Sequence, residues 1–302
     1  NKKTDGSITK SIRGIPKLID ANYAGTIKSN QCTLILCEGD SAKAGVVSGL
    51  SKEDRNIYGV YPMRGKLLNV RDETAKKIGD NKEITEIKQI LGLETGKEYT
   101  PEELTSILRY SKVLFMTDQD LDGSHIKGLG INMFDSLWKS LLQIDGFIGF
   151  MNTPIIKATK KGKTLLFYND GEYALWKQQN ETGWAIKYYK GLGSSTPQEG
   201  KEYFKAFKIV TYHWDEQASS TVNIACAKDM ANSRKTWLSD YDEDAILDIN
   251  QSSVSISDFI NKDLIHFSNY DNHRSIPSVF DGLKPSLRKI MYCAFKRNLK
   301  NE

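Results

Sequence analysis

The spacing of apolar residues predicts strands that alternate with helices in the first half of the chain. Residues 31–36 form a short apolar run rich in strand-favouring types, and a Glu–Gly–Asp turn and a segment with helical spacing follow it. Similar apolar runs at 58–62 and 113–117 predict two more strands. Strands that are apolar on both faces are typical of a mostly parallel sheet covered by helices on both sides, so the pattern predicts an α/β fold.

The remaining pattern predicts further helices and a change of architecture after residue 146. Helices are predicted over 83–91, 101–110 and 124–142, the last from apolar residues at three- and four-residue spacing. Residues 147–160 and 163–168 predict a hairpin around Lys161-Gly162-Lys163. Later expectations are a strand at 185–190, helices over 197–207 and much of 221–249, a polar linker at 250–257, and a helical end broken at Ile276-Pro277.

Composition narrows the class of protein but not its partner. Apolar residues make up 39% and charged residues 26% of the 302 positions, which excludes wholesale disorder. No apolar run is long enough to cross a membrane, and the polar N-terminus lacks a signal core. The chain starts at Asn1 rather than Met and its last residues have the pattern of a helix cut in mid-course, so we expect a piece of a longer protein. The net charge of +4 says little about binding partners, but residues 284–300 contain six basic residues and no acid.

The cysteines indicate a reducing compartment and no structural zinc. None of the four forms a C-x-x-C pair, and the four histidines do not have zinc-finger spacing. Buried thiols are therefore the expected state of Cys32 and Cys37, which flank the first predicted strand.

Acidic residues follow two of the predicted strands directly. Glu38 follows the first strand, whereas Asp118, Asp120 and Asp122 follow the strand at 113–117. Ligands bind at the carboxyl edge of open parallel sheets, so these carboxylates converge if the two strands are neighbours. Converging carboxylates repel one another unless a cation neutralises them, and a set of hard oxygen ligands favours Mg²⁺. Carboxylate-bound magnesium is typical of phosphoryl chemistry.

Three other interpretations fit part of this pattern. An EF-hand loop shares the Asp spacing and the glycine, but Leu129 stands where its final Glu belongs and a strand precedes it. An aspartyl-phosphate phosphatase also uses a D-x-D motif after a strand, but it leaves the Glu38-Gly39-Asp40 turn unexplained. Surface acids that cap a helix are the third interpretation, and Asp122 alone fits that role.

A series of short motifs lies along the chain in one order. They are R-G-I-P-K-L at 13–18, E-G-D-S-A at 38–42, Y-P-M-R-G-K-L-L-N-V at 61–70, D-x-D-x-D-G-S-H-I at 118–126, Y-Y-K-G-L-G at 188–193, R-S-I-P-S at 274–278 and D-G-L-K-P at 281–285. Together they resemble the TOPRIM region and the start of the winged-helix cleavage domain of type IIA DNA topoisomerases, with Met63 in place of the family's Leu. The intervening sequence is more similar to the eukaryotic or large-virus branch than to bacterial gyrase.

The resemblance implies a domain order and a fold. It implies a lead-in segment (1–30), a TOPRIM metal-binding domain (31–151), a TOPRIM extension with a linker (152–250) and the truncated start of a winged-helix domain (258–302). The implied fold is a Rossmann-like parallel sheet with a mixed α+β extension and a helical winged-helix start.

The resemblance also implies an activity and its residues. Type IIA enzymes are ATP-hydrolysing isomerases that pass one duplex through a double-strand break held by a 5′-phosphotyrosine. By matching motifs, Glu38, Asp118, Asp120 and Asp122 are the implied ligands of Mg²⁺, for which Mn²⁺ or Ca²⁺ can substitute in binding. Glu38, Asp118 and Asp120 are also the implied catalytic residues, and Glu38 helps to move a proton at the 3′-oxygen. The implied DNA-binding residues are Arg64, Lys66, Lys190, Lys284, Arg288 and Lys289.

Two family parts are not found in the sequence. The nucleophilic tyrosine belongs downstream of residue 289, and Tyr292 does not match its motif; the ATPase domain that uses ATP belongs before residue 13. We therefore expect an inactive fragment of an enzyme that acts on double-stranded DNA as a homodimer, in the nucleus or at a viral replication site, without a membrane. The alternatives are a non-catalytic Mg²⁺-dependent DNA-binding module, or a TOPRIM nuclease or primase, which would lack the Y-K-G-L-G motif.

Overall fold

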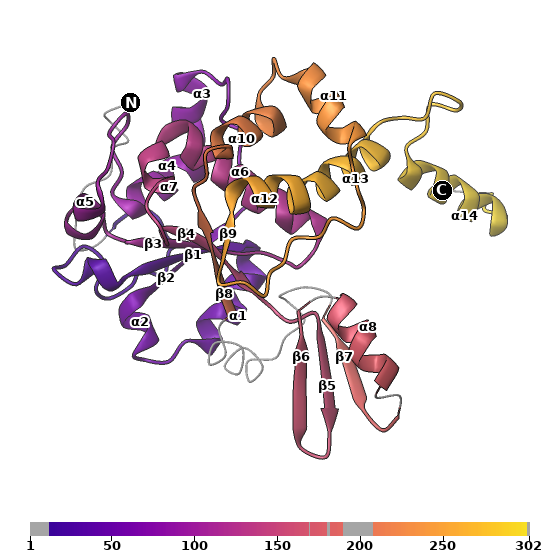
Figure 1. Cartoon of the computed structure of the whole chain (residues 1–302), viewed down its shortest axis with the longest axis horizontal. Helices are drawn as coiled ribbons and strands as arrows, with labels where there is room; N and C mark the ends of the chain where they lie inside the picture. The colour runs from indigo at the N-terminus through magenta and orange to yellow at the C-terminus, as the bar shows by residue number, and fades with distance from the viewer. Residues whose placement is uncertain (1–11, 169, 180–181, 190–207, 301–302) are drawn as a thin grey trace.

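A single large sheet forms the centre of the molecule (Figure 1). The computed structural model describes residues 12–168, 170–179, 182–189 and 208–300. Within them the large sheet has six strands. In order they are β2 (Tyr58–Met63), β1 (Thr33–Glu38), β3 (Lys112–Met116), β4 (Ile148–Asn152), β8 (Lys208–His213) and β9 (Ser253–Ser255). The first four run parallel, β8 is antiparallel to β4, and β9 is parallel to β8, which confirms the predicted α/β class.

The apolar strands are buried on both faces because helices cover both sides of this sheet. In β1, Leu34 and Leu36 pack into the larger core, which also contains side chains of α4 (Lys82–Leu91) and α6 (Leu121–Leu137). Ile35 and Cys37 point to the opposite face and pack against α1 (Gly39–Gly49). Because successive side chains of a strand point to opposite faces, β1 contributes apolar side chains to two cores.

Shorter helices connect these elements. They are η2 (Ser29–Gln31), α2 (Asp54–Ile57), α3 (Ala75–Asp80), α5 (Pro101–Ser106) and α7 (Lys139–Leu142). Thr100 and Glu103 form a capping box at the start of α5, with Pro101 at its first position, but α5 ends well before residue 110. The helix predicted over 124–142 is in fact two, because Trp138 leaves helical geometry with φ −148° and ψ 56°.

A second, smaller sheet projects from the first (Figure 1). Its described strands are β6 (Lys163–Phe167), β5 (Ile156–Lys160) and β7 (Ala185–Tyr188), all antiparallel, and α8 (Asp170–Gln179) packs beside them. The predicted hairpin is confirmed: Lys160 pairs with Lys163, and Lys161 and Gly162 form a two-residue turn with positive φ. The helix predicted over 197–207 lies outside the described residues.

The chain then returns to the large sheet. After β8 come α10 (Ala218–Cys226) and α11 (Ala231–Ser239), where a longer helical stretch was expected. Residues 250–257 are not a free linker, because β9 pairs with β8 there. One helical run follows, made of α12 (Ile256–Phe259), a π-helical turn η4 (Ile260–Leu264) and α13 (Ile265–Ser275). It ends at the predicted break before Pro277.

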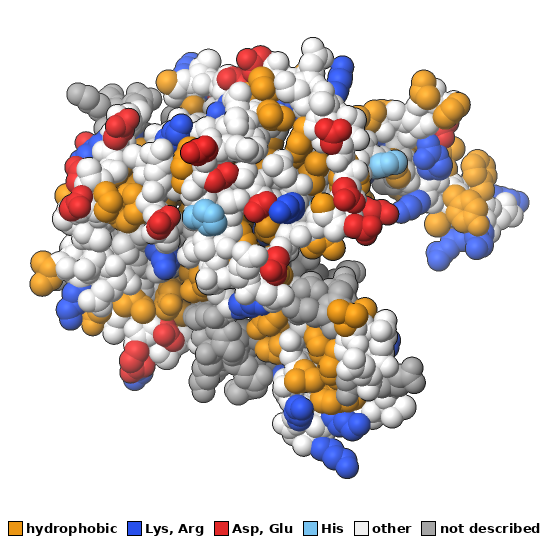
Figure 2. All heavy atoms as spheres, in the orientation of Figure 1, with side chains coloured by type: hydrophobic (Ala, Val, Ile, Leu, Met, Phe, Trp, Pro, Cys, Tyr) orange, Lys and Arg blue, Asp and Glu red, His pale blue; other side chains and the backbone are white. Residues whose placement is uncertain are grey.

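The last described helix, α14 (Pro285–Lys296), stands away from the sheets (Figure 1). Apolar side chains on it are exposed, among them Ile290, Tyr292 and Phe295 (Figure 2). Among the described helices, none combines the length and the apolar character that a membrane crossing requires.

Glycines let α6 approach its neighbours closely, which gives a test of the packing. A Cβ at Gly130 would lie 2.0 Å from the Phe115 ring in β3, whereas a Cβ at Gly128 would meet only the flexible end of Leu264 at 2.9 Å. We expect Gly130→Ala to lower the free energy of unfolding by about 1–3 kcal/mol through overpacking. Gly128→Ala, the matched control in the same helix, should stay within about 1 kcal/mol because alanine favours the helix. Denaturant unfolding measures both, and equal effects would contradict the packing described.

Candidate functional site

The pairing of β1 with β3 brings the two acidic motifs together. These strands are parallel neighbours in which Cys37 is level with Met116, so Glu38 and Asp118 leave the sheet side by side. The backbone N–H of Asp118 donates to Oε2 of Glu38 at 3.3 Å. The expectation that the two strands are neighbours is confirmed.

The acidic loop after β3 turns tightly into α6. Asp120 is the N-cap of α6, and its Oδ1 accepts from the backbone N–H of Gly123 at 2.8 Å. A Cβ at Gly123 would lie 2.0 Å from the backbone oxygen of Asp118, so glycine is required for this turn. A strand precedes the loop, so the EF-hand interpretation does not fit. The residue that caps α6 is Asp120 and not Asp122.

Negative charge accumulates at this edge of the sheet. The pKa of Glu38 is raised, mainly by burial and further by the charges of Asp118, Asp120 and Asp122. A hydrogen bond from the Asp118 backbone opposes this rise. The carboxylates are thus close enough to repel one another, as converging metal ligands do before a cation binds.

Asp122 is neutralised by two cations of the same chain. Arg274 of α13 donates to both of its oxygens, at 2.6 and 2.9 Å, and the Nζ of Lys66 donates to Oδ1 at 2.7 Å. These contacts, that of Arg274 first, hold the pKa of Asp122 well below its usual range. Arg274 also binds Asp271 at 3.0 Å, so it links the acidic edge to α13.

An aromatic ring supports both cations. Lys66 lies 4.7 Å and Arg274 5.5 Å from the centre of the Phe267 ring, and His125 stacks on Phe267 with ring centres 3.9 Å apart. Nδ1 of His125 is buried and has no hydrogen-bond partner among the described residues. Burial, aided by the charge of Lys66, lowers the pKa of His125 to about 4.

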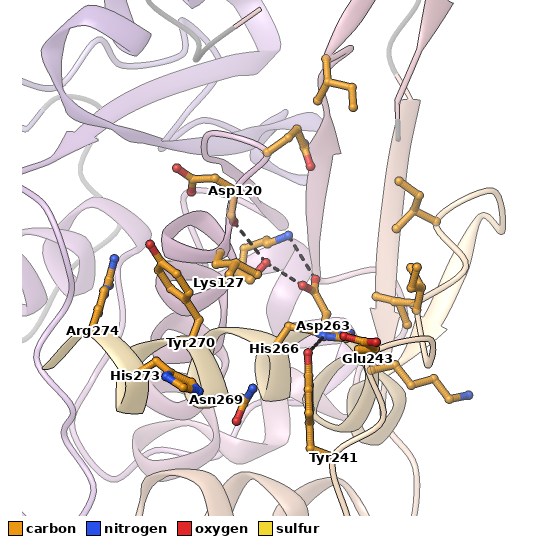
Figure 3. Close-up of a pocket in the computed structure, with 18 of the residues that line it drawn as sticks. Asp120, Lys127, Tyr241, Glu243, Asp263, His266, Asn269, Tyr270, His273 and Arg274 are labelled. Atoms are coloured by element: carbon orange, nitrogen blue, oxygen red, sulfur yellow. Dashed lines mark hydrogen bonds and ion pairs between the residues drawn. The ribbon is translucent and has the colours of Figure 1, made fainter. Parts of the chain in front are cut away.

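A second buried contact fixes the helical run beside α6. Lys127, 5% exposed, lies 3.5 Å from Oδ2 of Asp263 in η4, and Ser124 donates to Oδ1 of Asp263 at 2.6 Å. Lys127 and Asp263 lie in the wall of an open hollow (Figure 3), which Asp120, Tyr270 and Arg274 also line. The hollow has a volume of about 890 Å³, and Ser124 is part of its lining. The hollow therefore lies between the acidic loop and α13, with Lys289 of α14 at its border.

The structure brings only some of the predicted DNA-binding residues to the site. Lys66 contacts Asp122, and Arg64 is exposed. The pKa of Asp40 is lowered mainly by its hydrogen bond from Lys17, and the nearby charge of Arg64 adds to this lowering. Lys284, Arg288 and Lys289 lie on or just before α14, whereas Lys190 lies outside the described residues.

Arg288 is not a spare positive charge. Its guanidinium makes a bidentate ion pair with Asp281 at 2.7 to 2.9 Å. Asp281 lies just before the base-rich segment. The sequence pattern did not indicate this pair, because Asp281 lies just before the acid-free segment 284–300. It also missed the Arg274–Asp122 pair, although Arg274 lies in a motif, and the buried Lys127–Asp263 pair, for which the sequence gives no local signal.

The donors at the acidic edge suit a hard cation, but they do not form a closed metal site. Among the described residues, no three His, Cys, Asp or Glu side chains are placed to share one ion. Carboxylate oxygens are the ligands that Mg²⁺ prefers. The raised pKa of Glu38 reflects its burial first and then the negative charge of the neighbouring carboxylates. The chemistry of the donors therefore fits a divalent cation, while Asp122 is already bound by Arg274 and Lys66.

This sheet, with a carboxylate edge at β1 and β3, defines a Toprim domain. Residues 33–148 match the Toprim domain family, and residues 151–272 match the C-terminal associated domain of TOPRIM. DNA topoisomerase 2 of Arabidopsis thaliana is 50% identical over 309 residues and covers 100% of this chain, which spans 21% of that relative. Probable DNA topoisomerase 2 of Dictyostelium discoideum is 48% identical over 305 residues, with 100% of this chain and 20% of the relative covered.

A solved structure agrees along nearly the whole chain. It is the "topoisomerase II DNA-binding, cleavage and re-ligation domain" of Plasmodium falciparum, which superposes with a TM-score of 0.87 at 46% identity and covers 97% of this chain and 40% of its own. The chain belongs to the type II DNA topoisomerase family. It spans about a fifth of the length of the curated relatives it matches.

The buried state of His125 predicts a pH dependence of stability. Because its pKa is lowered from 6.5 to about 4, the unfolded chain takes up its proton first as the pH falls. The contribution of neutral His125 to the free energy of unfolding is therefore fully present above pH 6.5 and is lost as the pH falls from 6.5 to 4. The loss is at most about 3 kcal/mol before screening by solvent.

His125→Phe, which keeps a ring on Phe267, should flatten the free energy of unfolding in this window. His273→Gln, at an exposed histidine of α13, is the control and should keep the slope. An unchanged slope in His125→Phe would contradict the assignment. Denaturant titrations between pH 7 and 4 measure it.

Proposed function

We propose that this chain is the metal-binding and DNA-binding part of the breakage–rejoining core of a type II DNA topoisomerase. The observation that carries the proposal is the position of Glu38 beside Asp118 and its neighbours at the carboxyl edge of a Toprim sheet. The 97% overlap with a topoisomerase II DNA-binding, cleavage and re-ligation domain supports it. The whole enzyme would change DNA topology by ATP-dependent passage of one duplex through a break in another, through a tyrosine that we expect in another segment.

The proposed metal ligands are Glu38, Asp118, Asp120 and Asp122, with Mg²⁺ as the ion. A magnesium ion held there would offset charge on the oxygens of the DNA backbone during breakage and rejoining. Glu38 is the candidate for moving a proton at the 3′-oxygen, because its raised pKa brings it closer to neutral pH than an ordinary carboxyl. Asp122 could act as a ligand only if it gave up Arg274 and Lys66.

The proposed polymer partner is double-stranded DNA. Arg64 and Lys66 follow β2 and lie beside the acidic edge, and Lys289 borders the hollow on the other side. Lys284 and Arg288 belong to the same proposed surface, and Lys190 remains a prediction. Homodimer formation, the use of ATP and a nuclear or viral site of action are carried over from the family as parts of the same proposal, as are the domain limits at residues 31, 151 and 258.

One observation favours a second candidate, a module that binds DNA and Mg²⁺ without chemistry. Asp122 is neutralised within the chain, so the acidic edge of this conformation offers fewer open ligands than an active site needs. The two functions differ in whether Asp118 is needed for breakage or only for binding.

A graft into a related enzyme separates these functions. The chain would replace the matching segment of the Arabidopsis thaliana relative, and the product would be assayed for ATP-dependent relaxation of supercoiled DNA. We expect activity with the wild-type segment and its loss, with DNA binding retained, in the Asp118→Ala segment. A graft that folds and binds DNA but is equally active with Asp118→Ala would overturn the catalytic proposal and leave the binding module.

Direct metal binding is the second test. Asp118→Ala and Asp120→Asn should each weaken Mn²⁺ binding at least about tenfold; asparagine at 120 can still cap α6. Asp145→Ala, at an exposed acid before β4 and so at the opposite edge of the sheet, should bind as the wild type does. Titration calorimetry measures all three, and unchanged affinity in both edge variants would remove these residues from the ligand set.

A further inference from the structure

Three lysines gather at the far end of the small sheet, away from the acidic edge. Lys160 ends β5, Lys161 lies in the turn and Lys163 begins β6; we call these three the lysine tip. The hairpin that carries them points away from the large sheet (Figure 1), and Figure 2 shows basic side chains over this end. Lys161 and Lys163 are exposed. Nothing in the proposed metal chemistry uses this surface.

The hairpin keeps these charges together although its own geometry disfavours them. Lys160 and Lys163 are directly paired across the strands, where like charges are destabilising. Lys161 adopts φ 46°, a left-handed conformation that favours Gly, Asn or Asp over a long side chain. Residues 156–167 contain four lysines and no acid.

The base of the tip makes contacts that accommodate the charge of Lys160. The Nζ of Lys160 donates to the backbone oxygen of Thr182 at 2.9 Å and lies 5.7 Å from the centre of the Trp184 ring. Trp184 in turn packs edge-on against Trp176 of α8, with ring centres 5.0 Å apart. Lys161 and Lys163 therefore extend from a hairpin that contacts residues 182–184 through Lys160.

Protection of an exposed sheet edge does not explain all three lysines of the tip. Lysines on exposed edge strands prevent sheet-to-sheet association, and Lys163 on the edge strand β6 fits that role. Lys161 does not, because it lies in the turn, where no strand could pair. Charge that is concentrated against local preference is a feature of binding surfaces.

We propose that the lysine tip binds backbone phosphates of duplex DNA, as a contact separate from the acidic edge. A duplex carries one negative charge per about 1.7 Å of its axis, so several cations within a few residues can each meet a phosphate. The proposal rests on the proposed function for its choice of DNA as the polyanion. The contact is to the backbone, so it carries no base sequence.

The test uses the whole 302-residue chain with EDTA, so that no metal contributes at the acidic edge. Fluorescence anisotropy would give the affinity for two duplexes of unrelated sequence at several salt concentrations. In Lys161→Asn/Lys163→Gln we expect weaker binding of both duplexes and a slope of log affinity against log salt reduced by roughly 0.9 for each lost contact. Asparagine suits the left-handed turn, so the melting temperature should stay the same or rise.

The matched control is Lys52→Gln/Lys76→Gln, which removes two exposed lysines from the Toprim part of the chain. Its slope should stay close to that of the wild type. Equal slopes in the tip variant, the control variant and the wild type would overturn the proposal for the tip while leaving DNA binding intact. Failure of the wild-type chain to bind any duplex would overturn the proposed DNA-binding function as well. If the tip variant loses binding to vesicles of anionic phospholipid but not to duplexes, the surface binds membranes and the proposal is wrong.

Discussion

Repulsion among carboxylates at one edge of a parallel sheet is the constraint on which the functional end of this molecule depends. The register of β1 on β3 places Glu38 next to Asp118, and the tight turn at Gly123 folds the following acids back onto the same edge. Such a cluster is stable only where positive charge or helix dipoles face it. The N-terminus of α6 supplies a dipole, and Asp120 caps it. The remaining charge has to come from other parts of the chain or from a bound cation.

The chain supplies that charge from two distant segments, and this positions its C-terminal helices. Lys66 comes from the segment after β2, and Arg274 comes from the end of α13, and both meet Asp122 over the ring of Phe267. The buried Lys127–Asp263 pair holds the same helical run one turn further along α6. Electrostatic contacts of this kind are directional, so they fix the register of α13 on α6 where apolar packing alone would allow it to slide.

Sequence patterns predicted the elements that depend on local spacing. The central strands, the hairpin at Lys161-Gly162 and the acidic edge followed from apolar runs, turn residues and the position of acids after strands. Long-range choices could not be read in this way. The Arg274–Asp122 pair joins residues 152 positions apart, and β9 is a strand only because β8 lies beside it. The end of α6 at Trp138 is likewise invisible to a helical period that continues to Leu141.

The contrast between paired and clustered lysines and arginines shows why the net charge of +4 was uninformative. Lys66, Arg274 and Arg288 each form an ion pair with a carboxylate of this chain, so their charges are largely neutralised within it. In the hairpin, by contrast, Lys160 is paired directly with Lys163 across strands that contain no acid. A basic residue in a motif is therefore weak grounds for DNA contact until its partners are known. A lysine that lies beside another positive charge is stronger evidence of a DNA contact, even outside any motif. Folding alone would favour replacing such a lysine with an uncharged residue.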